Sequence, residues 1–303
     1  MSKPSGSRTQ VMVYLLLVFI FSSVFYFLAL RAHKFGVWQG LYLVGFMWCP
    51  ALAATATLKL NGRELRDLGW GWPQAKYVAE SWLIPLLYGT IAYAIAWGSG
   101  LAGFPNHEFM EHLVPRMGLG LSPVASTIVY VVVAGSFGLI QSLATALGEE
   151  IGWRGFLVPE LFKTMGFTGT ALFSGVVWAC WHYPLLFWGG YNGGTPMWYG
   201  VMCFTVMVLA MSFVLVWMRL KSGSLWVGAV MHASHNLYIQ QILTPLTQNT
   251  GKTAWFIDEF GALLPIVAAG FAIYFWRQRG AVDRRHAIEH VQSQDRTAVH
   301  IAR

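Results

Sequence analysis

Two carboxylates, two imidazoles and a carboxamide interrupt apolar stretches of this chain that are long enough to cross a membrane. They are Glu149, Glu150, His182, His232 and Asn236. A charge near the centre of a bilayer costs ~2.5–3.5 kcal/mol on an insertion scale, so residues of this kind usually have a function. Carboxylates and imidazoles take protons from water, and imidazoles and amides donate hydrogen bonds to a developing oxyanion. The combination predicts hydrolysis inside a membrane.

The first polar cluster lies in the segment G-E-E-I-G-W-R-G-F-L-V-P, residues 148–159. On a helix Glu150 and Arg154 share a face and can form an ion pair. Glu149 points about 100° away, so it stays free to act as a base. If the helix continues to Pro159, Glu149 lies ~12 Å from the cytoplasmic end. The alternative interpretation is an interfacial cluster whose long side chains reach the membrane surface.

The second and third clusters are W-A-C-W-H-Y-P and M-H-A-S-H-N. Trp178 lies one turn before His182, and His232 shares a helix face with Asn236. Counted from helix starts near residues 171 and 224, these groups lie ~12–18 Å deep. A lone intramembrane histidine often only bonds to a neighbouring helix. The similar depth on three helices instead predicts one shared site, with His235 in a supporting role.

Other reactive residues receive structural interpretations. The cysteines, Cys49, Cys180 and Cys203, are odd in number and fall within apolar stretches, so we interpret them as small buried side chains. Asp258 and Glu259 are interpreted as residues at the outer membrane interface.

One segment resembles a zinc-protease helix without meeting its requirements. Residues 107–112 read H-E-F-M-E-H, but the zinc-binding pattern needs His four residues after His107, where Glu111 stands. The inverted pattern fails because it needs His at Glu108. We therefore expect a solvated face of a short surface helix near residues 108–113.

The composition predicts an all-α, polytopic membrane protein. Of the 303 residues, 56% are hydrophobic and 11% are charged, whereas soluble domains carry about 25% charged residues. A helix needs about 20 mostly apolar residues to cross the hydrocarbon core. Eight stretches qualify: roughly 11–30, 37–58, 78–98, 130–157, 169–189, 198–218, 224–245 and 257–276.

The net charge of +7 is explained by the predicted topology and does not indicate a nucleic acid partner. With eight spans, 16 of the 20 Lys and Arg residues fall on the side of both termini. The other four are Arg31, Lys34, Arg116 and Lys252. Because cytoplasmic loops carry an excess of Lys and Arg, both termini are expected in the cytoplasm.

These boundaries divide the chain into five parts. We expect a cytoplasmic tail at 1–10, N-terminal transmembrane helices over 11–129 and a catalytic core over 130–245. A final transmembrane helix over 246–280 and a polar cytoplasmic tail at 281–303 complete the chain.

At the three clusters the chain resembles the CPBP family of intramembrane endopeptidases. This family comprises CAAX proteases and bacteriocin-processing enzymes and is also called the Abi or type II CAAX prenyl endopeptidase family. Its pattern is E-E-x-x-x-R, then F-x-x-x-H, then H-x-x-x-N. The matching residues are Glu149, Glu150, Arg154, His182, His232 and Asn236. The resemblance covers about residues 130–245, and Trp178 stands where the family usually has Phe.

The resemblance implies a role for each residue. Glu149, assisted by His182, would deprotonate a water molecule for attack on a peptide carbonyl. His232 and Asn236 would donate hydrogen bonds to the oxyanion, each contributing ~2.7–4 kcal/mol. Glu150 and Arg154 would fix the position of the base. If a metal is bound, zinc held by Glu149, His182 and His232 is the candidate.

The implied function is an intramembrane endopeptidase of the CAAX protease type, and possible uses include CAAX-type processing, bacteriocin maturation and immunity. We expect a cavity open to the cytoplasm, a membrane-embedded or membrane-associated peptide or protein as substrate, and a multi-pass location in a bacterial inner membrane. A proton-coupled transporter is the first alternative, although the polar groups cluster in one stretch instead of repeating in two halves. A non-catalytic membrane immunity or scaffold protein is the second. The sequence leaves the oligomeric state and any need for prenylation open.

Overall fold

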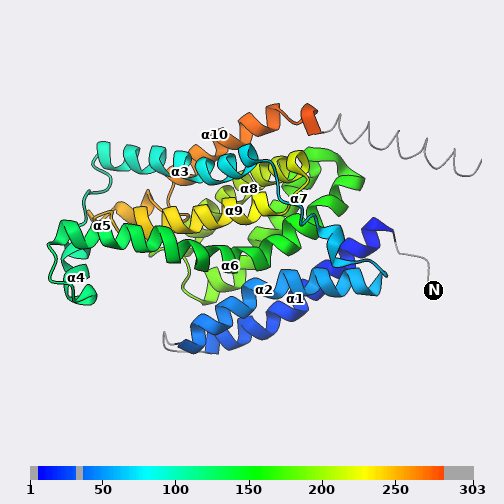
Figure 1. Ribbon diagram of the computed structural model, residues 1–303, viewed down its shortest axis with the longest axis horizontal. Coiled ribbons are helices and arrows are strands. Elements are labelled where there is room, and N and C mark those ends of the chain that lie inside the picture. Colours follow the sequence, from blue (N-terminus) through cyan, green and yellow to red (C-terminus); the bar gives the residue numbers. More distant parts are fainter. Residues whose placement is uncertain (1–5, 32–36, 283–303) are drawn as a thin grey trace, which may run out of the picture.

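The computed structural model of this protein describes residues 6–31 and 37–282. It is 80% helical, and the described residues form no strand. The long helices run up and down the long axis of the molecule (Figure 1). The predicted fold class, an all-α polytopic membrane protein, is confirmed.

Ten α-helices follow one another in the described residues. They are α1 (Ser7–Arg31), α2 (Val37–Leu60), α3 (Ala75–Gly98), α4 (His107–Met117), α5 (Pro123–Val133), α6 (Leu139–Glu150), α7 (Val158–Trp188), α8 (Met197–Ser222), α9 (Trp226–His235) and α10 (Leu263–Arg277). Two short 3₁₀ helices are η1 (Leu65–Leu68) and η5 (Thr253–Trp255). Three π-helical segments are η2 (Ala134–Gly138), η3 (Ile151–Leu157) and η4 (Asn236–Leu243).

Two of the π-helical segments lie at the predicted catalytic motifs. η3 begins directly after Glu150, and η4 begins at Asn236. A π-helical turn changes the direction in which neighbouring side chains point, and such turns are frequent at functional sites. The polar motifs therefore occupy the places where the winding of their helices changes.

Five stretches of the described residues are long and apolar enough to cross a membrane: Ser7–Arg31, Gly40–Leu60, Ala75–Gly98, Pro123–Trp188 and Met197–Ser222. The 66-residue stretch contains two of the predicted spans. They are separated at Gly166, whose φ of +61° breaks α7 into two helices. The last two predicted spans correspond to the shorter helices α9–η4 and α10. The count of eight spans stays a prediction.

Two other expectations concern the chain ends and the outer segment. The surface helix expected near residues 108–113 is α4, which begins after Asn106, whose side chain accepts a hydrogen bond from the Phe109 N–H. α1 already begins at Ser7, so the expected tail at 1–10 is partly helical. Most of the expected tail at 281–303 lies outside the described residues.

Close packing of the helices brings the motifs together. α9 packs against α3, α6 and α8, while α7 packs against α1 and α8. Gly228 on α9 allows Glu150 to approach, because a Cβ atom there would lie 2.4 Å from Glu150 Oε2. Gly152 likewise allows α2 to approach, because its Cβ would lie 2.4 Å from Pro50 Cβ. A larger residue at Gly152 would push α2 away, and one at Gly228 would displace the Glu150 side chain.

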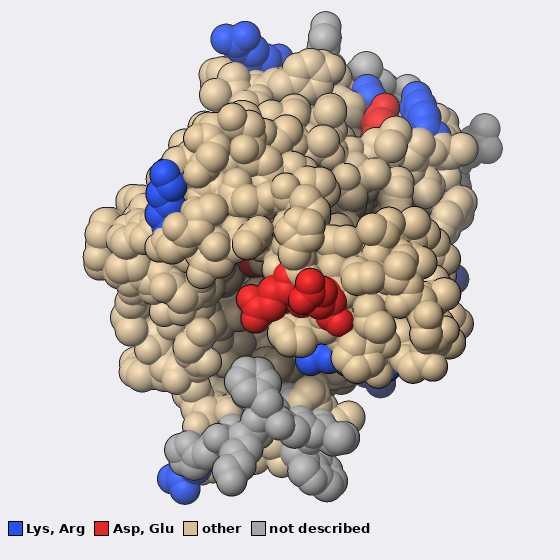
Figure 2. Space-filling view, turned by 90° about the vertical axis from the view of Figure 1, so that its left-hand side faces the viewer, with Lys and Arg blue, Asp and Glu red and all other residues tan. Residues whose placement is uncertain are grey.

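The two ends of the bundle differ in character. We call the end with the connections 61–74, 157–167 and 222–226 the basic end, and the end with the connections 99–122, 189–196 and 244–262 the open end. α1, α3, α7 and α9 run from the basic end to the open end, and the helices between them run back (Figure 1). The face at the left of Figure 1, the open end, is largely uncharged, with one acidic patch beside a hollow (Figure 2).

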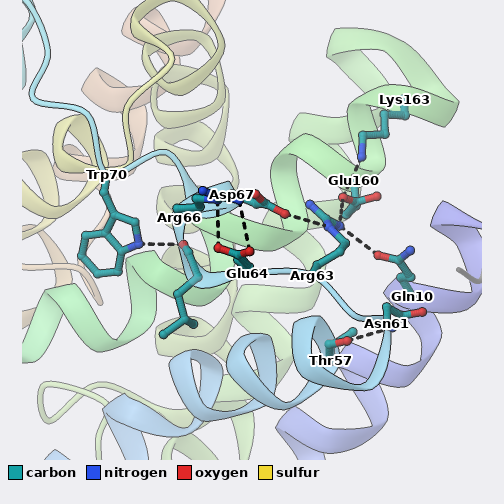
Figure 3. Close-up of polar contacts among 11 residues, drawn as sticks. Gln10, Thr57, Asn61, Arg63, Glu64, Arg66, Asp67, Trp70, Glu160 and Lys163 are labelled. Carbon is teal, nitrogen blue, oxygen red and sulfur yellow. Dashed lines mark hydrogen bonds and ion pairs between the residues drawn. The ribbon is translucent and has the colours of Figure 1, made fainter. Parts of the chain in front are cut away.

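The basic end is held closed by a polar network (Figure 3). Arg63 donates to Glu160 Oε1 at 2.7 Å and to Gln10 Oε1 at 2.9 Å, and Lys163 donates to Glu160 Oε1 at 2.7 Å. Behind this network Arg219 Nε donates to the Arg154 carbonyl at 2.7 Å. These contacts tie α1 and the connection 61–74 to α7, and they tie α8 to η3.

Candidate active site

One cavity inside the bundle is lined by all four predicted catalytic residues, Glu149, His182, His232 and Asn236. Its volume is about 370 Å³. Glu149 comes from the end of α6, His182 from α7, and the other two from α9 and the start of η4. The structure thus brings together the groups that the sequence placed at similar depths on three helices.

Glu149 is almost fully buried, and tryptophan side chains hold one of its oxygens. Trp178 Nε1 donates to Oε2 at 2.7 Å, and Trp153 Nε1 lies 3.4 Å from the same oxygen. Both indoles therefore restrain Oε2, which leaves Oε1 as the oxygen that can take a proton from water. A Phe, which the family usually has at the position of Trp178, could not make this hydrogen bond.

His182 is oriented by its own helix. Its Nδ1 lies 3.0 Å from the carbonyl oxygen of Trp178, one turn earlier. A carbonyl oxygen only accepts, so Nδ1 carries the hydrogen, and in the neutral ring Nε2 keeps a lone pair. The rings of Trp181 and Phe204 lie 4.8 Å and 5.1 Å from the imidazole, between centroids, and pack around it. The ring is therefore set to accept a proton through Nε2.

Glu150 connects the first motif to the third. Arg154 Nη1 lies 2.8 Å from Glu150 Oε1, which confirms that the two side chains form the predicted contact. His232 Nδ1 lies 3.1 Å from the same oxygen, a contact that the sequence did not predict. Because Nδ1–H is used by the carboxylate, His232 can donate through Nε2 only as an imidazolium. The Arg154 guanidinium also lies 4.3 Å above the Trp178 ring.

A second cluster of polar side chains lines the same cavity nearer to the open end. His235 Nε2 lies 2.6 Å from Glu259 Oε1, and its Nδ1 lies 2.6 Å from the Tyr88 hydroxyl. Gln240 Nε2 donates to Glu259 Oε1 at 2.9 Å, and Tyr191 donates to Oε2 at 3.1 Å. Only 6% of Glu259 is exposed, so its carboxylate is buried among these partners, while its expected position at the outer membrane interface stays a prediction. Nothing in the sequence marked its pairing with a histidine on another helix.

The remaining candidate residues lie apart from the cavity. The side chains of His107, Glu108, Glu111 and His112 on α4 are exposed, in agreement with a solvated face. Cys49 and Cys203 are buried, and none of the three cysteines is in a disulfide.

The arrangement of the candidate zinc ligands bears on whether they can hold a metal ion. Among the described residues, no group of three or more His, Cys, Asp or Glu side chains is arranged to hold a metal ion. Glu149, His182 and His232 therefore do not fit a three-ligand metal site here. Zinc binding stays an untested prediction, and elemental analysis of the purified protein tests it.

Comparison with a family of known proteins covers the part of the chain that carries all three motifs. Residues 124–238 match the model of the family described as type II CAAX prenyl endopeptidase Rce1-like. The resemblance to the CAAX protease family is confirmed. The Rce1-like segment starts at α5 and ends within η4, so it contains every candidate catalytic residue but not Glu259.

One curated relative carries a name from the same group of proteases. It is the CAAX prenyl protease 2 of Methanococcus maripaludis, which is 32% identical over 143 residues. The match covers 45% of this chain and 49% of the relative. The chain therefore spans about half the length of this relative, and the activity of the whole protein is a matter for proposal.

Proposed function

We propose that this protein is an intramembrane endopeptidase of the CAAX protease type, with Glu149 as the base that activates water. One observation carries the proposal. Four residues from three separate motifs line a single cavity, within a segment that matches the Rce1-like family. Three of them are groups that move or donate protons, and the fourth is an amide that can donate a hydrogen bond.

The reaction begins with a water molecule between Glu149 and His182. Glu149 takes one proton from this water through Oε1. The second O–H group of the water donates a hydrogen bond to His182 Nε2, which orients the water. The oxygen attacks the peptide carbonyl carbon, and the carbonyl oxygen becomes an oxyanion. When the C–N bond breaks, Glu149 returns the proton to the leaving nitrogen, so that the products are a carboxyl group and an amine.

Donors on α9 and η4 stabilise the oxyanion. The Asn236 amide donates one hydrogen bond, and His232 donates another through Nε2 in its imidazolium form. Glu150 keeps the His232 ring in place through Nδ1, and Arg154 balances the charge of Glu150. Because Glu150 Oε1 is shared by His232 and Arg154, these two contacts restrain all three side chains.

The walls of the cavity favour an apolar substrate. Leu30, Leu43, Phe46, Met207 and Met211 line it together with the polar residues. Flexible methionines adapt to substrate side chains of different shape. We propose a membrane-embedded or membrane-associated peptide or protein as substrate, with CAAX-type processing or bacteriocin maturation and immunity as its possible uses, and a bacterial inner membrane as the location.

The test is proteolysis by purified protein in detergent, with fluorogenic peptides that contain an apolar segment. Cleavage by the wild type and its loss in Glu149→Ala are expected. Glu111→Ala is the matched control, since this exposed glutamate of α4 lies outside the cavity. Full cleavage by Glu149→Ala would overturn the assignment of the base.

A further inference from the structure

The cavity extends from the catalytic residues toward one end of the bundle only. Beyond Glu149 and His232 it is lined by Leu30 in the last turn of α1, by Gly189 at the end of α7 and by Tyr191 after it. All three positions belong to the open end. The hollow in the face of the open end is visible in Figure 2.

The opposite direction is closed by packed protein. All seven residues of η3, the segment between Glu149 and the basic end, are buried. Arg219 is buried behind η3 and donates to the carbonyl oxygens of Arg154 and Leu68. Within the described chain, no residue of η3 or of the connection 61–74 lines the cavity. Among the residues that the structure describes, packed protein therefore separates the cavity from the basic end.

The charge distribution identifies the side of the membrane on which each end lies. Ten described Lys and Arg residues outside the catalytic motifs lie at the basic end: Arg8, Lys59, Arg63, Arg66, Lys76, Lys163, Arg219, Lys221, Arg277 and Arg279. Three lie at the open end: Arg31, Arg116 and Lys252. Short cytoplasmic loops carry the excess of basic residues, so the basic end faces the cytoplasm.

From these observations we infer that the cavity is reached from the non-cytoplasmic side of the membrane. Its substrate is an apolar peptide segment presented on that side, such as the outer end of a membrane protein or an exported peptide. The cleavage of this segment rests on the proposed function. The sequence predicted both a cavity that opens to the cytoplasm and termini that lie in the cytoplasm. In this structure the cavity opens at the end opposite to the described chain ends, so the two predictions cannot both hold. We retain the cytoplasmic location of the termini.

The rim of the open end adds a preference for charge. The exposed acidic side chains of α4, Glu108 and Glu111, lie at this end, where Figure 2 shows an acidic patch beside the hollow. Basic residues are few at this end, so the local field attracts cations. A substrate with a basic residue next to its apolar segment should therefore be preferred over an acidic one.

Labelling of single cysteines from each side of the membrane tests this inference without any need for cleavage. In a background in which Cys49, Cys180 and Cys203 are replaced by Ala, one variant carries Leu30→Cys at the mouth. A second carries Met211→Cys inside the cavity, and a third carries Arg66→Cys, which is exposed at the basic end. Each is treated with a small, charged, membrane-impermeant thiol reagent in right-side-out and in inverted vesicles.

The expected result is labelling of Leu30→Cys and Met211→Cys at least tenfold faster in right-side-out vesicles, with Arg66→Cys labelled faster in inverted vesicles. Faster labelling of the two cavity cysteines from the inverted side would overturn the inference. Since labelling needs no catalysis, absence of Glu149-dependent cleavage would count against the proposed function alone. Size-exclusion profiles equal to those of the cysteine-free protein show that each variant is folded.

Discussion

The two ends of this bundle differ in how closely they are packed. At the basic end, buried Glu160 accepts from Arg63 and Lys163, and η3 is completely covered. At the open end a hollow is visible (Figure 2), and Leu30, Gly189 and Tyr191 at this end line the same cavity as Glu149. The catalytic residues lie between them, held by packed helices on one side and accessible from the other. In the proposed mechanism, the closed end positions the base and the open end supplies it with water.

Loss of the base is the largest expected effect. Glu149→Gln preserves the shape and an oxygen that accepts from Trp178, but an amide cannot take a proton from water. We expect kcat to fall by roughly 10³-fold, within the ~10²–10⁴-fold range of general base catalysis. The rate of peptide cleavage measures this, and a rate within tenfold of the wild type would show that another group is the base.

Removal of an oxyanion donor should follow in size. Asn236→Ala takes away one hydrogen bond that forms only as the oxyanion develops, so kcat should fall ~10²–10³-fold with little change in KM. Steady-state kinetics separate the two constants. A rise in KM at constant kcat would instead assign Asn236 to substrate binding.

A smaller loss is expected when the indole donor is removed at the closed side of the base. Trp178→Phe keeps an aromatic ring but loses the 2.7 Å hydrogen bond to Glu149. A hydrogen bond to a charged group contributes ~1.5–3 kcal/mol, so we expect a rate about ten- to a hundredfold lower. Trp276→Phe, which removes an exposed indole donor on α10, is the control. Unchanged cleavage by Trp178→Phe would mean that Trp153 alone aligns the carboxylate.

The network of the basic end should affect stability rather than rate. Glu160→Gln weakens the contacts with Arg63 and Lys163, whose side chains are partly exposed, so the free energy of unfolding should fall by only about 1 kcal/mol. The kcat should stay within twofold. Thermal unfolding in detergent measures the first quantity. Glu64→Gln, in an exposed ion pair with Arg66, is the control and should change neither.

Chelation should have the smallest effect of all. Because the three candidate ligands are not arranged as a metal site, activity after incubation with a strong chelator should stay within twofold of the untreated protein. Peptide cleavage and elemental analysis of the same sample provide the measurement. A loss that added zinc restores would assign a metal to the reaction.

Local spacing predicted the residues of the site but not their mutual contacts. The four-residue spacing of Glu150 and Arg154 was enough to predict their contact, since helix geometry alone determines it. The contact of Glu150 with His232 spans 82 residues, and that of His235 with Glu259 depends on a loop outside the Rce1-like segment. Such contacts arise from helix packing, for which periodicity carries no signal.

The overall fold shows the same division. Hydropathy predicted the long helices well, because about 20 apolar residues in sequence suffice to indicate a span. It missed the π-helical segments and the late start of α10 at Leu263, which depend on tertiary packing. The direction in which the cavity opens could not be read from the depth of Glu149 either, because depth along one helix does not reveal which side its neighbours cover.

Trp178 contacts two members of the site at once, with its indole N–H on Glu149 and its main-chain carbonyl on His182. The carboxylate belongs to α6 and the imidazole to α7, so a single residue keeps two helices in step. A shift of about one ångström between them would break the indole hydrogen bond, which weakens steeply with distance and angle. Trp178 thus acts as a mechanical interlock: if α6 and α7 moved apart, Glu149 would lose this restraint, and the proposed hydrolysis would be confined to the tightly packed bundle.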